Sequence, residues 1–153
     1  MAEQPTCSCG ANEQKRIIFP CAGQANTGQL TNLAALQLTE EGYGSIACVA
    51  LLAIGAENLV ANAKNADEVV VLDGCPMLCA QKIADAQGVP VGQHLVVTEL
   101  GITKGPSKNY TNDNIETIVA ACWKGTGRRI GSDPSKKAGK KDGGCGCGCN
   151  GTC

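Results

Sequence analysis

Four cysteines in the middle of the chain are spaced in a way that suits metal coordination. Cys21, Cys48 and Cys75 each follow a short apolar segment, and 27 residues separate each from the next. One strand–helix–strand unit has about this length, so parallel strands would bring the three thiols to the carboxyl edge of one sheet. Cys79 follows Cys75 by one helical turn and joins them. Four thiolates suit zinc, and a four-cysteine set fits an iron–sulfur cluster as well.

An Asp-Gly pair precedes the third of these thiols. Asp73 and Gly74 lie between an apolar β-branched run and Cys75, and we expect the Asp73 carboxylate to organise the strand-to-helix turn or to support the ligands as an acceptor. The alternative for every thiol is a buried free cysteine, because free cysteine packs as a small hydrophobe. Positions at glycine-rich turns favour ligation for the four, whereas Cys122 lies in an apolar helical pattern and is predicted to be a core residue.

Thiol chemistry is an open alternative for the same residues. Cys75 is expected at a helix N-terminus, where backbone N–H groups stabilise a thiolate, and Cys79 could act as its resolving partner. Their spacing has one residue more than the CxxC of thioredoxin-like enzymes. In this alternative the chain is a thiol-dependent redox or soft-metal transfer protein. Neither alternative favours a particular enzyme class.

More cysteines lie near the two ends of the chain. Cys7 and Cys9 lie in a polar head, and the tail ends in CGCGCNGTC, which contains Cys145, Cys147, Cys149 and Cys153. Glycines between thiols let a backbone wrap a soft metal, so these four are candidates for a second metal site. Nothing in the tail fixes a geometry before metal arrives, and adventitious metal affinity is the alternative.

The rest of the pattern alternates between strands and helices. Asn112 or Asp113 is expected to cap the last helix, and Pro76 to occupy the first position of the helix before it. Alternation of this kind indicates the α/β class, with a mostly parallel sheet of about four strands and helices on both faces. Strands are predicted at 15–19, 43–47, 68–72 and 94–98, and helices at 27–41, 48–64 (broken near Gly55), 76–87 and 112–123.

Composition divides the 153 residues into one domain and two tails. Residues 1–14 form the polar head, residues 15–124 the α/β domain, and residues 125–153 a basic Gly/Cys-rich tail that we expect to be flexible. Residues 124–153 carry seven basic and two acidic residues, and the whole chain has a net charge of −1 and four aromatic residues. With so few aromatics, and lysines dispersed among glycines, no nucleic-acid partner is expected.

No targeting or membrane segment is expected. The first sixteen residues contain no apolar run after a basic start, and the longest apolar run, residues 46–54, is far shorter than the roughly 20 residues that cross a bilayer. We therefore expect a cytoplasmic protein. In a reducing compartment, eleven cysteines indicate metal ligation or thiol chemistry before structural disulfides.

These residues together resemble a known family. Asp73-Gly74-Cys75-Pro76 after VVVL, with Cys79, the early Pro20-Cys21-Ala-Gly23 and Gly28-Gln29-Leu30-Thr-Asn32 segments, and Cys48, is similar to the DGC-domain family. The resemblance covers about residues 15–124. It implies zinc chelation by four cysteines, here Cys21, Cys48, Cys75 and Cys79, with no defined catalytic activity. The cysteines of the head and tail lie outside the family pattern.

Overall fold

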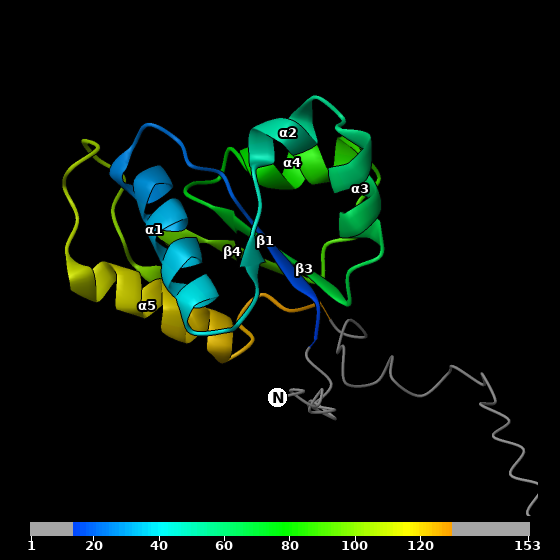
Figure 1. Ribbon diagram of the computed structural model, residues 1–153. Helices are drawn as coiled ribbons and strands as arrows, with labels where there is room; N and C mark the ends of the chain where they lie inside the picture. Colours follow the sequence, from blue (N-terminus) through cyan, green and yellow to red (C-terminus); the bar gives the residue numbers. More distant parts are fainter. Residues whose placement is uncertain (1–13, 130–153) are drawn as a thin grey trace, which may run out of the picture.

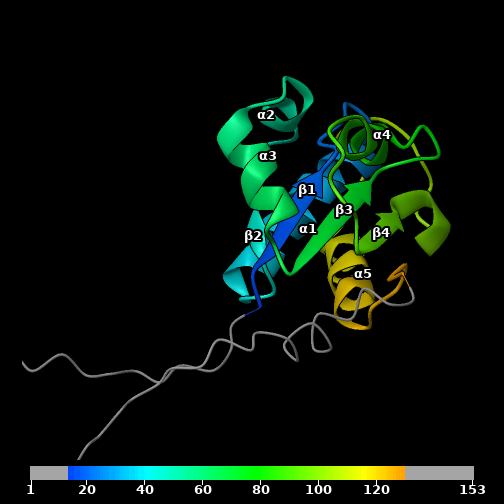
Figure 2. The ribbon, with the colours of Figure 1, turned by 90° about the vertical axis from the view of Figure 1, so that its right-hand side faces the viewer.

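Four parallel strands form the centre of the described chain, which is residues 14–129 of a computed structural model. Within that range the strand order is β2-β1-β3-β4, and every neighbouring pair is parallel (Figure 2). This confirms the predicted α/β class and its parallel sheet. The strands are β1 (Arg16–Pro20), β2 (Ser45–Ile46), β3 (Glu68–Asp73) and β4 (Gln93–Val96).

Helices cover both faces of this sheet, as predicted. The long helices α1 (Asn26–Glu40) and α5 (Asn112–Trp123) pack together on one face. The other face is covered by α2 (Val49–Ala53), α3 (Glu57–Lys64) and α4 (Cys79–Ala86), as Figure 1 shows. A short 3₁₀ helix, η1 (Val97–Leu100), follows β4 directly. None of the helices within residues 14–129 is both long and apolar enough to cross a membrane.

Alternating strand residues supply the two layers of core. Ile18 of β1 packs in the cluster under α1 and α5, whereas Ile17 and Phe19 pack in the cluster under α2, α3 and α4. The six residues of β3 are buried along their whole length, as expected for a β-branched strand with helices on both faces. Because β1 and β3 are parallel neighbours in the centre of the sheet, their carboxyl ends lie side by side at one edge.

Several element boundaries differ from the sequence prediction, and the second strand, predicted at 43–47, comprises only Ser45–Ile46. The fourth helix begins at Cys79 and not at Pro76, because the Asp73 carboxylate accepts the N–H groups of Ala80 and Gln81 and so anchors the first turn there. The last strand ends at Val96, where η1 takes over. The last helix is capped by Thr111, whose side chain and that of Asn114 form a capping box, and not by Asn112 or Asp113.

Residues 125–129, which composition groups with the tail, lie against the sheet. Arg128 Nε donates to Glu68 Oε1 at 2.8 Å, and the N–H of His94 donates to the carbonyl of Gly127 at 3.1 Å. Glu68 is fully buried and also accepts from Arg16 Nε at 2.7 Å, so one carboxylate ties β1, β3 and this segment together. The predicted head and tail sites, with Cys7, Cys9, Cys145, Cys147, Cys149 and Cys153, lie outside the described residues.

Replacing the shared carboxylate tests this tie. We expect Glu68→Gln to lower the free energy of unfolding by about 2–4 kcal/mol, because two guanidinium groups lose their buried partner. Urea denaturation followed by far-UV circular dichroism measures the change. Glu99→Gln, an exposed site on η1, is the matched control and should stay within about 0.5 kcal/mol of the wild type. Equal losses in the two variants would contradict this role for Glu68.

Candidate functional site

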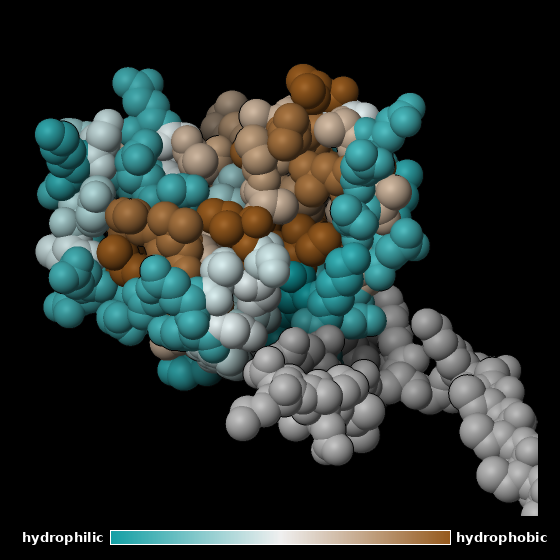
Figure 3. All heavy atoms as spheres, viewed as in Figure 1, coloured by the Kyte–Doolittle hydropathy of each residue, from teal (hydrophilic) through white to brown (hydrophobic). Residues whose placement is uncertain are grey.

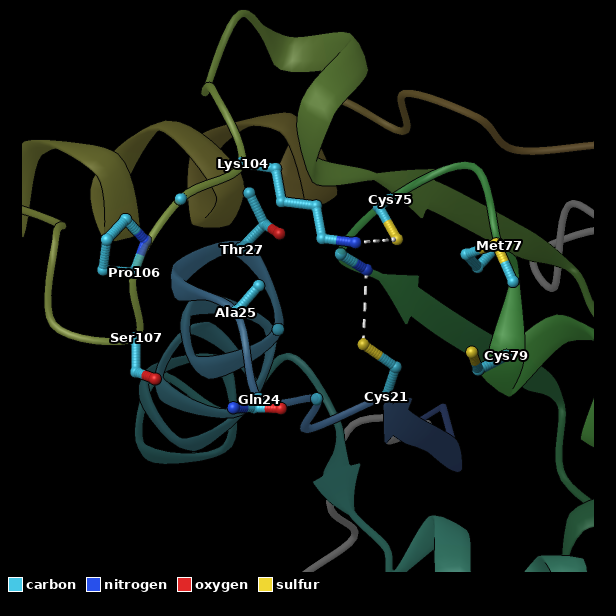
Figure 4. A pocket seen from close by; sticks show the side chains of 14 residues that line it. Cys21, Gln24, Ala25, Thr27, Cys75, Met77, Cys79, Lys104, Pro106 and Ser107 are labelled. Carbon is cyan, nitrogen blue, oxygen red and sulfur yellow. Dashed lines mark hydrogen bonds between the residues drawn. The ribbon is translucent and has the colours of Figure 1, made fainter.

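A pocket opens at the point in the sheet where the chain reverses its direction of progress. From β1 the chain moves outward to β2 and then crosses back to β3, so β1 and β3 are neighbours whose following loops diverge. Open parallel sheets bind ligands at such points, outside the carboxyl ends of the strands. The pocket has a volume of about 400 Å³, and three of the four predicted thiols, Cys21, Cys75 and Cys79, line it (Figure 4).

Cys21 is held at the end of β1 by contacts to three segments. Its backbone N–H donates to the carbonyl of Leu72, and its Sγ accepts the N–H of Gly74 at 3.3 Å. The hydroxyl of Thr31 lies 3.7 Å from the same sulfur and accepts the N–H of Ala22 at 3.1 Å. The first thiol is therefore fixed relative to both the loop after β3 and the first turns of α1.

Gly74 allows the loop after β3 to reach α1, and Gly28 allows α1 to approach Gly23 in the loop after β1. A Cβ on Gly74 would lie 2.8 Å from the backbone N of Gly28, and a Cβ on Gly28 would lie 2.5 Å from the carbonyl O of Gly23. Real Cβ atoms do not approach backbone so closely. The Asp-Gly-Cys loop thus needs glycine at its second position to bring Cys75 beside the start of α1.

Cys75 lies beside a lysine. Lys104 Nζ is 3.5 Å from Cys75 Sγ, close enough for the ammonium to donate a hydrogen bond to the sulfur (Figure 4). The loop carrying Lys104 is fastened to α1 by the buried side chain of Asn26, whose Oδ1 accepts from Gly105 N at 2.6 Å. The Nδ2 of Asn26 donates to the carbonyls of Thr103 and Asn109 at 3.0 and 2.8 Å.

The same loop occupies part of the N-terminus of α1. The carbonyl of Gly105 accepts the N–H of Asn26, and Asn26 Oδ1 accepts the N–H of Thr27. These donors are therefore satisfied within the protein. Hydrogen bonds from residues 103–109 therefore fix the start of α1, which follows the loop that carries Cys21.

Asp73 lies beneath the pocket and does not line it. Its carboxylate is buried, accepts the two N–H groups at the start of α4, and lies 2.9 Å from His94 Nε2. His94 aligns with Val71 in the sheet, and its imidazole reaches the carboxyl edge. Its side chain extends two residues along the strand direction to Asp73. In this position Asp73 organises the turn that carries Cys75 and Cys79.

Cys48 lies in a separate, mainly apolar hollow. It is exposed at the start of α2, and the hollow is also lined by Cys21, Ile46 and Val49. Figure 3 shows apolar surface over the region of α2, where Leu51 and Ile54 are exposed. Cys21 is thus common to both hollows, whereas Cys48 does not line the pocket that holds Cys75 and Cys79. Within residues 14–129, no three His, Cys, Asp or Glu side chains lie close enough together to hold a metal ion.

Sequence reasoning missed Lys104. The signal was available, because GITKGPSKN follows the last strand of the sheet and must leave from the carboxyl edge where the thiols were expected. The spacing of the cysteines, however, contains no information about this segment. Ala22 follows Cys21, and Leu78 precedes Cys79. Both adopt left-handed backbone, with φ values of 48° and 54°, and nothing in their residue types indicates this.

Cys122 is the core residue that its pattern predicts. It is fully buried in α5, and this burial raises the pKa of its thiol to about 12. The sulfur is on the face of the sheet covered by α1 and α5. It therefore contributes packing and no chemistry.

Fold and site together define a class: an open parallel α/β domain with a thiol-lined pocket at the reversal point of the sheet. The family model of the DGC domain matches residues 17–122. The chain belongs to the DGC-domain family, as its Asp73-Gly74-Cys75 motif indicated.

One curated relative extends this result. The anaerobic and virulence modulator AnvM of Pseudomonas aeruginosa is 30% identical over 88 residues, which are 58% of this chain and 67% of AnvM. No solved structure matches the chain. The comparisons therefore establish the family of the chain.

Adding one methyl group tests the close backbone approach. We expect Gly74→Ala to lower the free energy of unfolding by about 1–3 kcal/mol, because its Cβ would meet the backbone of α1. Gly105→Ala is the matched control on the opposite wall of the pocket, since its Cβ would meet only side-chain atoms at 3.6 Å or beyond. Thermal denaturation of both variants measures the difference, and a Gly105→Ala loss as large as that of Gly74→Ala would contradict it.

Native thiol reactivity tests the burial of Cys122. At about pH 8 a thiol with a pKa near 12 is ionised in only about one molecule in ten thousand. We therefore expect iodoacetamide to leave Cys122 unmodified in the folded protein and to alkylate it in urea, as read by peptide mass spectrometry. Alkylation of Cys122 in the folded protein at the rate of the exposed Cys48 would show that α5 does not protect it.

Proposed function

We propose that the protein binds zinc through the thiols at the reversal point of its sheet. The observation that carries this proposal is that Cys21, Cys75 and Cys79, from two strand ends and one helix start, line a single pocket. Thiolate sulfur is a ligand that zinc prefers, and structural zinc sites are often built from cysteines alone. Membership of the DGC-domain family supports the same ligand set.

The residues present fit zinc by their chemistry and need rearrangement to enclose it. Cys21, Cys75 and Cys79 would hold the ion from the pocket, and Cys48 would complete the set from the neighbouring hollow across Cys21. Cys48 and Cys79 are exposed at helix starts, so few packing contacts oppose a shift of either thiol. Sites of this kind form together with the metal, and the binding free energy then stabilises the fold.

Metal binding is the function that the surroundings of these thiols support. Asp73 and His94 are hydrogen-bonded to each other, and the Asp73 carboxylate also accepts a backbone N–H of α4. Neither side chain is therefore positioned to transfer a proton in the pocket. The relative AnvM is named as a modulator, which describes regulation and not a reaction. A reducing compartment would keep the thiols available for zinc.

Metal content and cobalt spectra test the proposal. The starting protein is the full chain with Cys7, Cys9, Cys145, Cys147, Cys149 and Cys153 replaced by serine, so that only the described thiols remain. We expect one zinc per chain by elemental analysis and a sulfur-to-cobalt charge-transfer band after exchange. Cys75→Ser should remove both signals, whereas Ser107→Ala, which alters another residue lining the pocket, should retain them.

Three results would overturn the zinc assignment. They are the absence of bound metal in the starting protein, a cobalt complex without thiolate absorption, and iron with visible colour, which would assign a cluster. Loss of zinc on Cys48→Ser would support the four-thiol set. Retention of one zinc in that variant would restrict the site to the three thiols of the pocket.

A further inference from the structure

The pocket carries one positive charge and no carboxylate. Its described lining contains three thiols, Met77, small and neutral polar residues, and Lys104 as the one charged side chain. A volume of about 400 Å³ is within the range of small-molecule sites. Lys104 itself is exposed, and a cleft lined by charge of one sign raises the local concentration of small ions of the opposite sign. The electrostatics therefore select small anions over cations.

The reactive atom next to that charge is the sulfur of Cys75. Lys104 Nζ lies 3.5 Å from it, and a thiol beside a lysine in a partly exposed position is typical of reactive cysteines. Ala22 and Leu78 adopt left-handed backbone next to Cys21 and Cys79, and they are the two non-glycine residues to do so in the described chain. Strained backbone of this kind concentrates at functional sites.

We propose that the metal-free pocket captures an anionic low-molecular-weight disulfide and that Cys75 forms a mixed disulfide with it. A carboxylate of the ligand pairs with the ammonium of Lys104, and the ligand's sulfur–sulfur bond lies at Cys75. This inference goes beyond zinc binding. It uses the same pocket and does not depend on a bound metal.

The step is a thiol–disulfide exchange. The Cys75 thiolate attacks one sulfur of the ligand, a bond forms between them, and the ligand's own disulfide bond breaks. Cys75 is oxidised to the mixed disulfide, and the departing half of the ligand is reduced to a thiolate that takes a proton from water. The oxidant is the ligand itself, so no other co-reactant is required.

Cys48 provides an internal control for the reactivity of Cys75. Cys48 is more exposed than Cys75, lies at the start of a helix, and does not line this pocket. If exposure alone decided reactivity, Cys48 would react first. A faster reaction at Cys75 therefore reports the pocket.

Two disulfides of opposite charge test the proposal on the full chain, reduced and kept metal-free with a chelator. Glutathione disulfide carries a net negative charge and cystamine a positive one, and both offer the same bond. Peptide mapping with fragment spectra after an acid quench gives the rate of adduct formation at Cys75, Cys79 and Cys48. We expect glutathione disulfide to modify Cys75 about fivefold or more faster than cystamine does, with the reverse or no preference at Cys48.

Substitution of the lysine assigns the preference. Lys104→Met should abolish the preference of Cys75 for the anionic disulfide, and Lys104→Glu should reverse it. Lys108→Met is the matched control, because Lys108 is exposed on the same loop and does not line the pocket. It should leave the preference of Cys75 within about twofold of the wild type.

The wild-type comparison alone can overturn the proposal. Equal rates with the two disulfides at Cys75, or modification of Cys48 ahead of Cys75 by glutathione disulfide, would show that the pocket does not select the ligand. Because these reactions are run without metal, their failure is separate from a failure to bind zinc. An effect of Lys108→Met as large as that of Lys104→Met would remove Lys104 from the assignment.

Discussion

A close approach of two backbones is the constraint on which the site depends. The loop after β3 lies against the first turn of α1 at a distance that leaves no room for a Cβ on Gly74, and Gly28 in that turn is as close to Gly23 in the loop after β1. This contact places the N–H of Gly74 on the sulfur of Cys21 and carries Cys75 to the same wall. The Asp-Gly-Cys motif is therefore a packing motif, since its aspartate anchors the start of α4 and its glycine allows the close approach of α1.

The loop of residues 104–107 lines another side of the pocket, and a side chain from α1 holds it in place. Asn26, buried at the start of α1, bonds to residues 103, 105 and 109 and so fixes the loop that carries Lys104. A charge on a loop of this length would otherwise sample many positions. Here the carboxamide restricts the backbone on both sides of the lysine, and the ammonium remains near one sulfur.

The alternation of strands and helices, the parallel sheet and the carboxyl edge could all be predicted, because β-branched runs and equal spacing are local signals. The spacing indicates which edge three thiols share and not how far apart they lie along it. Strand order decides that: β1 lies between β2 and β3, which separates Cys48 from Cys75 by one strand. The start of α4 and the role of Lys104 depend on contacts to Asp73 and Cys75 across the fold, and such contacts leave no periodic trace.

The place of Cys21 between the two hollows has a consequence of its own. It lines the pocket of Cys75 and Cys79 on one side and the hollow of Cys48 on the other. One side chain therefore forms part of the wall of both hollows, and any change in the position of Cys21 alters the shape of the two together.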